Sequence, residues 1–298
     1  MGMDPSPGSK RVLVIGGGPA GMKAACSAAE RGHKVTLVEK KHRLGGQVLL
    51  NRDIPGRREM VTLAEDLINN LEALTVDIIL GKEANPELIR EMAPDAVVVA
   101  SGARPILPDM SGIESKKVVQ AWDLLDGKVG VGKKVAIVGG NAVGLETALY
   151  LANQGTISPE VLHFLMTNRA ESLKGLTELL NKGNKEVTVV EMAKRAGQDI
   201  GPSTRWTVMA ELRRLGVSIR TGTKAVGITP DGLEVEKKGG PDFVPADSVV
   251  IAAGSRSENG LIGQIQGMGS EIYTVGDARE PRNVLEAIRE GFMVGLRL

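Results

Sequence analysis

Short apolar runs alternate with amphipathic stretches along the chain. Residues 12–15 and 96–100 are wholly apolar, and residues 35–38 are apolar except for Thr36. Runs of this length are typical of strands buried on both faces of a parallel sheet. Residues 19–31, between the first two runs, carry alanines on one helical face. They therefore predict a helix, which completes a strand–helix–strand unit.

The same pattern starts again in the second half of the chain. Residues 135–138 predict a strand, residues 145–153 a helix, and residues 187–190 a strand that ends at Glu191. The run at 249–254, which ends at Gly254, then echoes the earlier run at 96–100, which is followed by Ser101 and Gly102. This repetition indicates an internal duplication of one supersecondary unit.

The order of the elements predicts that one domain is inserted into the other. The strand expected at 272–275 follows the second set, and we expect it to return to the first sheet. The expected division is 1–10 as a linker or tag, 11–109 with 269–298 as the first domain, and 110–268 as the second domain, with a helical insertion at about 156–186.

A glycine motif follows the first strand and opens the first helix. Gly16, Gly18 and Gly21 have the spacing G-x-G-x-x-G. The first glycine allows a tight turn, the second lets the backbone approach a pyrophosphate, and the third lets helix and strand pack closely. Glu39 lies 23 residues after Gly16, where a carboxylate can accept hydrogen bonds from ribose hydroxyls. The first domain is therefore predicted to be a Rossmann-like dinucleotide-binding domain.

The second glycine motif departs from this pattern in two ways. Gly139 and Gly144 keep the first and last glycines, but Asn141 replaces the middle one. Asn tolerates positive φ better than most residues, yet its side chain takes space near the phosphates. Glu191 stands 52 residues after Gly139, whereas about 20 are usual. Two interpretations stay open: a second Rossmann-like domain that binds a nucleotide, or one that no longer does.

Composition limits the classes of cofactor and partner. The net charge of +1 indicates no nucleic acid, and no apolar run approaches the roughly 18–20 residues of a membrane span. Cys26 is the only cysteine, so this chain alone builds neither a disulfide nor an iron–sulfur site. The three histidines lack metal-ligand spacing, so no metal is expected. A cytoplasmic location is expected for such a chain.

Several stretches, in one order along the chain, carry a resemblance to a known family. They are residues 16–21, 39–40, 44–47, 100–105, 201–206, 275–278 and 286–288. Together they resemble the pyridine nucleotide–flavin oxidoreductases with two dinucleotide-binding domains. Within that family the chain is most similar to the C-terminal FAD/NAD region of the enoate reductase, 2,4-dienoyl-CoA reductase and trimethylamine dehydrogenase group, which is related to old yellow enzyme. The resemblance implies an α/β fold of two Rossmann-like domains, with the NAD(P) domain inserted into the FAD domain in the glutathione-reductase-like arrangement.

The resemblance also implies an activity and a partner. The chain is expected to be an FAD-dependent oxidoreductase that takes hydride from NADH, with NADPH as the alternative donor. In the resembling group a flavin-bearing barrel and an iron–sulfur site precede this region, so we expect a redox partner domain or subunit that carries FMN and an iron–sulfur cluster. No catalytic acid or base is expected, because the cofactors carry the chemistry. The alternative is a structural FAD/ADP-binding module without its own NADH oxidation.

The expected contacts of the two cofactors follow from the matching motifs. For FAD they are Gly16, Gly18, Pro19, Ala20, Gly21, Glu39, Lys40, Gly46, Gln47, Ala84, Ala100, Ser101, Gly102, Gly276, Asp277 and Ala287. For the nicotinamide nucleotide they are Gly139, Asn141, Val143, Gly144, Glu146, Glu191 and Gly254. The family motif places Asp277 at the ribityl chain. Glu191 is expected to favour NADH by repelling a 2′-phosphate, although Lys194 and Arg195 follow it closely.

Residues outside these motifs are expected to be structural. Asn283 and Glu286 have the spacing of a capping box at the last helix. Cys26 is expected to be a buried small side chain, His33 to be solvated, and Trp206 to be a packing residue and not a platform for a substrate. The insertion is expected to present an apolar face, covered either by its own domain or by a partner. Its residues are Leu162, Leu165, Leu176 and Leu180.

Overall fold

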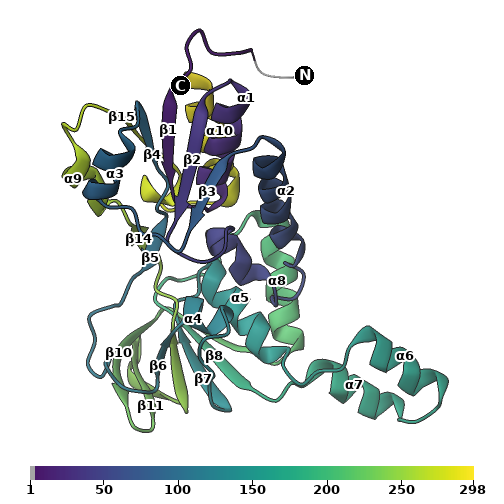
Figure 1. Cartoon of the computed structure of the whole chain (residues 1–298). Helices are drawn as coiled ribbons and strands as arrows, with labels where there is room; N and C mark the ends of the chain where they lie inside the picture. Colours follow the sequence, from purple (N-terminus) through teal and green to yellow (C-terminus); the bar gives the residue numbers. More distant parts are fainter. Residues whose placement is uncertain (1–3) are drawn as a thin grey trace. The chain divides into compact units, whose positions relative to one another are not determined.

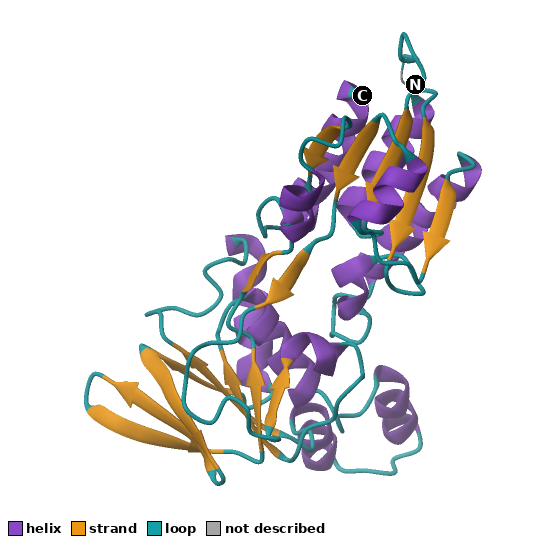
Figure 2. Ribbon diagram, turned by 60° about the vertical axis from the view of Figure 1, so that its left-hand side comes forward, coloured by secondary structure: helices purple, strands orange, loops and turns teal. Residues whose placement is uncertain are grey.

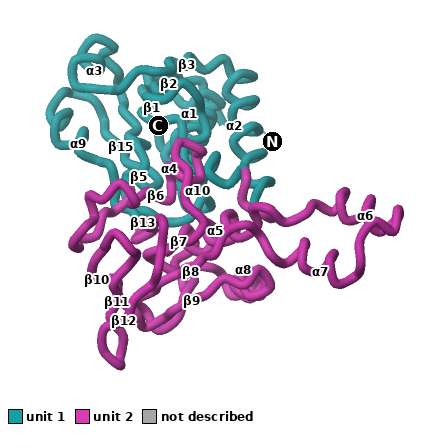
Figure 3. Tube along the Cα trace, turned by 90° about the horizontal axis from the view of Figure 1, so that it is seen from below, with its two compact units in different colours: residues 1–52, 57–104, 255–298 teal, residues 53–56, 105–254 magenta. Residues whose placement is uncertain are grey.

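The chain divides into two compact units, shown in different colours in Figure 3. A computed structural model describes residues 4–298. Unit 1 contains the residues up to 52 together with 57–104 and 255–298, and unit 2 contains residues 53–56 and 105–254. Each unit has its own hydrophobic core. One unit is thus inserted into the other along the chain, as the order of the elements predicts.

Unit 1 contains a five-stranded parallel sheet with the strand order β15-β4-β1-β2-β3 (Figure 1). Its strands are β1 (Arg11–Ile15), β2 (Lys34–Glu39), β3 (Asp77–Leu80), β4 (Ala96–Val99) and β15 (Glu271–Thr274). β15 pairs with β4 in parallel, with Ile272 opposite Val97. The strand near the end of the chain therefore does return to the first sheet.

Helices cover both faces of this sheet (Figures 1 and 2). The helices of unit 1 are α1 (Pro19–Glu30), α2 (Glu59–Ala73), α3 (Pro86–Met92), α9 (Gly260–Ile265) and α10 (Val284–Arg297), with short 3-10 turns η1 (Gly46–Asn51) and η2 (Gly276–Ala278). The core on one face joins α1, α2 and α10, and the core on the other face joins α3 and α9. Alternating layers of this kind bury both faces of a parallel sheet.

Unit 2 repeats this arrangement with a different strand at its edge. Its five-stranded parallel sheet has the order β6-β13-β7-β8-β9. The strands are β6 (Val118–Gln120), β7 (Lys134–Val138), β8 (Glu186–Glu191), β9 (Ser218–Thr221) and β13 (Ser248–Ile251). The edge position that β15 holds in unit 1 is taken in unit 2 by β6, which precedes the duplicated strands in the sequence.

The two faces of the second sheet are covered differently. The helices α4 (Ala121–Leu125), α5 (Ala142–Ala152) and α8 (Pro202–Arg214) pack on one face. The other face is covered by a three-stranded antiparallel sheet, whose strands are β10 (Thr223–Thr229), β11 (Gly232–Lys237) and β12 (Gly240–Pro245). This antiparallel sheet connects β9 to β13, where unit 1 has α3 between β3 and β4.

The insertion before β8 forms two helices that project from the rest of unit 2 (Figures 1 and 3). They are α6 (Pro159–Thr167) and α7 (Leu173–Asn181), capped by Ser158 and Ser172. The four leucines predicted to form an apolar face, covered by their own domain or by a partner, are buried or half-buried within the chain itself. The exposed apolar side chains of the insertion are instead Val161, Phe164, Met166, Leu173 and Leu179.

The boundaries between the units differ from those expected at 110 and 268. The contact pattern divides the chain after residues 104 and 254. The segment that follows residue 254 contains β14 (Ser255–Ser257), which pairs with β5 (Ala103–Pro105), and then α9. Ile265 of α9 is 1% exposed and belongs to the core beneath the first sheet. Sequence periodicity had given no sign of this return, because both elements are short.

The segment before β1 is bonded to unit 1. Ser6 donates its N–H to Arg31 O (2.9 Å), Ser9 Oγ donates to Gly32 O (2.8 Å), and Lys10 donates its N–H to His33 Nδ1 (3.1 Å). His33 is consequently only 6% exposed, so the prediction that it is solvated is wrong. The remainder of the predicted linker, residues 1–3, lies outside the described residues.

Two other side chains test the sequence interpretation. Trp206 is 67% exposed, so the prediction that it is a packing residue is wrong. It lies two residues before the buried Val208, and therefore on the opposite side of α8. The predicted cap of α10 is confirmed, because Asn283 Oδ1 accepts the N–H of Glu286 at 3.0 Å.

None of the described helices combines the length and apolarity of a membrane-crossing segment.

Candidate nucleotide-binding sites

The three glycines of the first motif serve three different needs. Gly16 has φ +108°, and a Cβ there would overlap the carbonyl of Ala100. A Cβ on Gly21 would overlap the carbonyl oxygen of Gly16. Gly18 has an ordinary extended backbone (φ −79°, ψ 177°), and a Cβ there would meet no atom within 4 Å. Gly16 and Gly21 are thus required by the fold, whereas Gly18 leaves open space in front of the helix.

That open space lies at the N-terminus of α1, which has no side-chain cap. Uncapped N–H groups and the helix dipole make such an end a site for an anion. A pyrophosphate needs both open space and free N–H groups, and this end supplies both. The residues around the first motif therefore fit a bound dinucleotide.

Glu39 stands at the end of β2, beside the same turn. Its Oε2 accepts the N–H of Gly17 at 2.7 Å, and its Oε1 accepts the N–H of Lys41 at 2.8 Å. The side chain is 9% exposed. The two backbone bonds fix the carboxylate in one orientation, and each oxygen keeps a second lone pair for a ribose hydroxyl.

Other predicted FAD residues gather around this helix end. A Cβ on Gly46 would lie 2.9 Å from Gly18 Cα, and a Cβ on Gly276 would lie 2.7 Å from Ala20 Cβ and 3.6 Å from Ala287 Cβ. These small residues keep the end of α1 clear of side chains.

Asp277 is tied to the same site by two hydrogen bonds. Its Oδ2 accepts from Gln47 Nε2 at 3.0 Å, and its Oδ1 accepts the N–H of Arg282 at 3.2 Å. Glu290, which sequence reasoning missed, accepts the N–H of Gly276 at 2.8 Å and pairs with Arg282. Glu290 lies one helical turn beyond Glu286 on α10, a spacing that is a weak signal in the sequence.

The remaining predicted FAD residues lie near the strand ends but are not all in contact with one another. Lys40 is exposed directly after β2. Ala84 follows the turn in which the N–H of Lys82 donates to Glu39 O at 3.1 Å. Ser101 Oγ donates to the carbonyl oxygen of Glu258, and Gly102 has φ +78°.

The second motif repeats the backbone of the first. Gly139 has φ +108°, and a Cβ on it would overlap the carbonyl of Ala252, as at the first turn. A Cβ on Gly144 would overlap the carbonyl oxygen of Gly139, as a Cβ on Gly21 would overlap that of Gly16. Glu191 Oε2 accepts the N–H of Gly140 at 2.5 Å, and its Oε1 accepts the N–H of Ala193 at 2.6 Å. The long insertion thus leaves Glu191 in the position that Glu39 has in unit 1.

Asn141 does not use the positive φ that its residue type tolerates. Its backbone is extended (φ −74°, ψ −177°), nearly the same as that of Gly18. Its Oδ1 accepts the N–H of Gly144 at 3.0 Å, and its Nδ2 donates to Ala252 O at 2.7 Å. The amide therefore caps α5 itself and occupies the place that is open at Gly18.

The other residues predicted for the second site lie around this turn. Val143 and Glu146 are half-buried in the first turns of α5, and Val143 O accepts a hydrogen bond from Thr147 Oγ1 at 2.7 Å. Gly254 is exposed after β13, with φ +95°.

Cys26 is buried in α1. Its Sγ lies 3.9 Å from Leu67 O, and burial raises the pKa of the thiol from 9.0 to about 11. The side chain is 2% exposed. The burial confirms the prediction that Cys26 is a buried small side chain.

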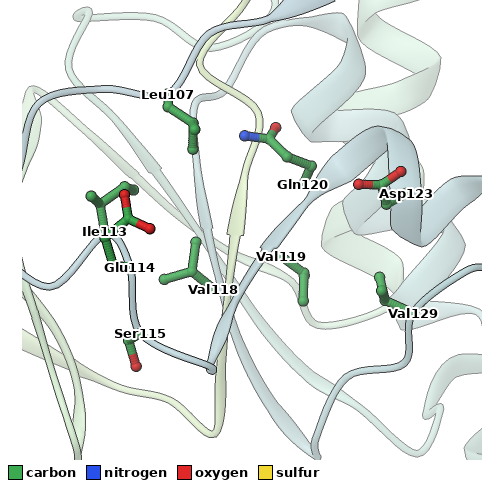
Figure 4. A pocket seen from close by; sticks show the side chains of 9 residues that line it. All are labelled: Leu107, Ile113, Glu114, Ser115, Val118, Val119, Gln120, Asp123 and Val129. Carbon is green, nitrogen blue, oxygen red and sulfur yellow. The ribbon is translucent and has the colours of Figure 1, made fainter.

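A separate pocket of about 290 Å³ lies in unit 2 (Figure 4). Leu107, Ile113 and Val118 line its apolar side, and Glu114 and Asp123 are its acidic residues. It shares no residue with either glycine motif.

The two glycine turns, each with a strand-end glutamate, define a protein with two dinucleotide-binding domains. Comparison with known proteins gives the particular family: residues 10–291 match the pyridine nucleotide-disulphide oxidoreductases, and the chain belongs to this family. The family binds FAD and uses NAD(P)H, so the predicted fold class and cofactors are confirmed. The chain is an oxidoreductase, but its single buried cysteine leaves no dithiol pair within these residues.

Several longer proteins are similar to the whole chain. A metal reductase of Desulforamulus reducens is 42% identical over 98% of this chain, which spans 44% of that protein. An NADH oxidase of Thermoanaerobacter brockii is 36% identical over 98% of this chain and 42% of its own length. The solved structure of 2-naphthoyl-CoA reductase with 2-naphthoyl-CoA superimposes with a TM-score of 0.85 at 30% identity, over 99% of this chain and 41% of that one. The chain thus spans less than half the length of these relatives, and the predicted resemblance to the enoate and dienoyl-CoA reductase group is confirmed.

Proposed function

We propose that this chain is the NADH-oxidising part of a larger reductase. In this proposal unit 1 holds FAD, unit 2 holds NADH, and electrons pass to a partner domain or subunit that carries FMN and an iron–sulfur cluster. FAD, when bound, supplies the acceptor for the hydride of the nicotinamide. The observation that carries the proposal is the repeated glycine turn and strand-end glutamate, present once in each unit.

The residues of unit 1 have separate tasks in this proposal. The open end of α1 at Gly18 receives the pyrophosphate, Glu39 accepts hydrogen bonds from the adenosine ribose, and Asp277 accepts them from the ribityl chain. The hydrogen bonds from Gln47 and Arg282 hold the Asp277 carboxylate in place before any ligand arrives. Orientation of this kind lowers the entropy lost on binding.

The partner is proposed from the size of the relatives. The metal reductase and the NADH oxidase are each more than twice as long as the part that this chain matches. The part of such a protein outside the match has room for the barrel and cluster. Cys26 is the only cysteine here, and iron–sulfur clusters generally take four.

A second candidate is a structural FAD- or ADP-binding module. One observation favours it: Asn141 fills the place that is open at Gly18, and the N–H of Ala142 is also bonded within the protein. In that case unit 2 would stay without a nucleotide.

Anaerobic reduction of the flavin separates the two candidates. We expect the purified protein to be yellow, to release FAD on acid precipitation, and to bleach on addition of NADH. NADH should react faster than NADPH, because the Glu191 carboxylate repels a 2′-phosphate. Stopped-flow absorbance with each nucleotide measures both outcomes. A flavin that dithionite bleaches and NADH leaves oxidised would favour the structural module, and faster reduction by NADPH would refute the assigned role of Glu191.

A further inference from the structure

The N-terminus of α5 is closed by a carboxylate from a neighbouring loop. The N–H of Ala142 donates to both oxygens of Asp199, at 3.0 and 2.9 Å. At the corresponding place in unit 1, the first residue of α1 is Pro19, which has no N–H. An internal anion therefore sits on α5 and not on α1.

The loop that carries Asp199 has a counterpart in unit 1. In unit 1 the N–H of Gly45 donates to Gly17 O at 2.8 Å, and in unit 2 the N–H of Gly197 donates to Gly140 O at 2.6 Å. Each of these glycines comes six residues after the strand-end glutamate. The two loops therefore hold the same position against their glycine turns.

This correspondence pairs Asp199 with Gln47. Each lies eight residues after its glutamate, Glu191 or Glu39. The Gln47 amide turns toward Asp277 and leaves the end of α1 open, whereas the Asp199 carboxylate turns onto the end of α5. The equal interval is the sequence signal that would have identified Asp199.

A carboxylate on a helix N-terminus makes the same interactions as a phosphate. Both accept the first free N–H groups, and both are stabilised by the positive end of the helix dipole. Asp199 and a pyrophosphate therefore compete for Ala142, and their like charges exclude joint occupancy. Asp199 is exposed and can turn into solvent, while Arg205 Nε holds the loop by donating to Ala196 O at 2.8 Å.

We infer that Asp199 sets the affinity of unit 2 for the pyrophosphate of a nicotinamide dinucleotide. Its carboxylate occupies the phosphate position in the free protein and leaves when the nucleotide binds. The inference rests on the proposed function, because it takes the second glycine turn as the nucleotide site. It also explains how the N-terminus of α5 can bind a nucleotide although Asp199 occupies it in the free protein.

Binding measurements on the full chain with FAD bound test this inference. The variants are Asp199→Ala and Asp199→Asn, and the matched control is Glu236→Gln. The control removes one exposed charge from β11. This strand covers the face of the five-stranded sheet of unit 2 that lies opposite α5. Titration calorimetry with ADP-ribose, which carries the pyrophosphate but no nicotinamide, gives Kd without turnover. We expect Kd to fall about fivefold for Asp199→Ala, within a range of roughly two- to thirtyfold for a helix-end anion, and less for Asp199→Asn.

Each outcome bears on one proposal or the other. An unchanged Kd, a weaker complex in the Asp199 variants, or an equal gain in Glu236→Gln would overturn the inference, because each excludes competition at Ala142. Absence of ADP-ribose binding in all proteins would overturn it as well. Flavin reduction by NADH is followed in the same preparations. If ADP-ribose binds more tightly to the variants but NADH bleaches none of them, the inference stands and the proposed function fails.

Discussion

Individual glycines separate the needs of the fold from the needs of the ligand. Gly18 and Gly21 belong to one motif, yet a Cβ meets nothing at Gly18 and overlaps backbone at Gly21. Motif matching treats the two as equivalent. The surroundings of each Cα distinguish a residue that shapes the protein from one that leaves room for a cofactor.

Alanine substitution at these two positions should therefore give opposite results. Gly18→Ala should change the free energy of unfolding of the apoprotein by no more than about 0.5 kcal/mol, while FAD affinity falls on the order of tenfold or more. Gly21→Ala should lower the free energy of unfolding by about 1–3 kcal/mol, as overpacking does. Urea unfolding of apoprotein and flavin titration measure the two effects. Equal destabilisation by both variants would contradict the assignment of open space at Gly18.

His33 gives the protein a pH dependence that the sequence did not indicate. Burial lowers the pKa of His33 from 6.5, and the charges of Arg31 and Lys10 lower it further. As pH falls below 6.5 the unfolded chain takes up a proton before the folded protein does, so the free energy of unfolding decreases. The hydrogen bond from Lys10 holds the pKa of the Glu271 carboxyl below 4.5. The stability that this carboxylate contributes is therefore lost only at lower pH.

We expect the free energy of unfolding to decrease between pH 7 and about pH 5.5, and His33→Asn to flatten that decrease. Asn keeps an acceptor for the N–H of Lys10 but does not titrate. Urea unfolding across this range makes the measurement, and His42→Asn, at an exposed histidine, is the control. The interpretation fails if the two variants have the same pH profile.

At the scale of elements, the insertion of α6 and α7 is separable from the domain that carries it. No residue of α6 is buried, and α7 buries only Leu176. The chain leaves and re-enters the domain at one place, where the N–H of Asn184 donates to Gln154 O at 2.7 Å. The insertion therefore adds little to the core around α5 and β8.

Joining Gly155 directly to Gly183 should leave unit 2 folded. The deletion removes two hydrogen bonds that Arg214 donates to Leu180 O and Asn181 Oδ1, both at 2.7 Å, and the local hydrogen bonds that Thr156 donates to Asn153. At about 0.5–1.5 kcal/mol for each bond, we expect Tm to fall by only a few degrees and ADP-ribose affinity to stay unchanged. Calorimetric melting and titration measure this. Loss of folding would show that the insertion is part of the core.

Periodicity located the elements of the two parallel sheets but not those around them. Runs such as residues 96–100 and 249–252 are buried on both faces, so their composition alone identifies them. The antiparallel strands β10–β12 are short and their buried and exposed positions alternate irregularly, with a register shift between Ala225 and Gly227, and β11 contains three charged residues. Asp199 and Glu290 were missed for another reason: each acts through a backbone N–H that folding brings close. In the sequence only a spacing marks each of them, eight residues after Glu191 for Asp199 and four after Glu286 for Glu290, and such a spacing is a weak signal until the contacts are known.

At the scale of the whole molecule, each unit has its own core and its own glycine turn. Asp277 belongs to unit 1, where its partners Gln47 and Arg282 also lie. A change at Asp277 therefore leaves the packing of unit 2 untouched. The two proposed cofactor sites can therefore be changed by separate mutations.

Asp277→Leu should release FAD without affecting the second site. We expect at least a tenfold loss of FAD affinity, because the isosteric apolar side chain accepts no hydrogen bond, and an ADP-ribose Kd within about twofold at unit 2. Bound flavin per chain and calorimetric titration with excess FAD check the two values. Asp231→Leu, at an exposed turn of unit 2, is the matched control. Loss of both ligands together would contradict independent sites.

The positions of β6 and β15 set the order in which the units become complete during synthesis. Every strand of the unit 2 sheet lies between residues 118 and 251, so that sheet is whole before the last part of the chain leaves the ribosome. The unit 1 sheet, which begins with residue 11, still lacks β15. Helix α1 also lacks α10, whose Gly291 and Gly295 pack directly against Ala20 and Ser27. The nascent chain therefore passes through a stage in which the inserted unit is finished while its host still exposes the apolar face of α1, and at that stage this face of α1 is a surface open to aggregation.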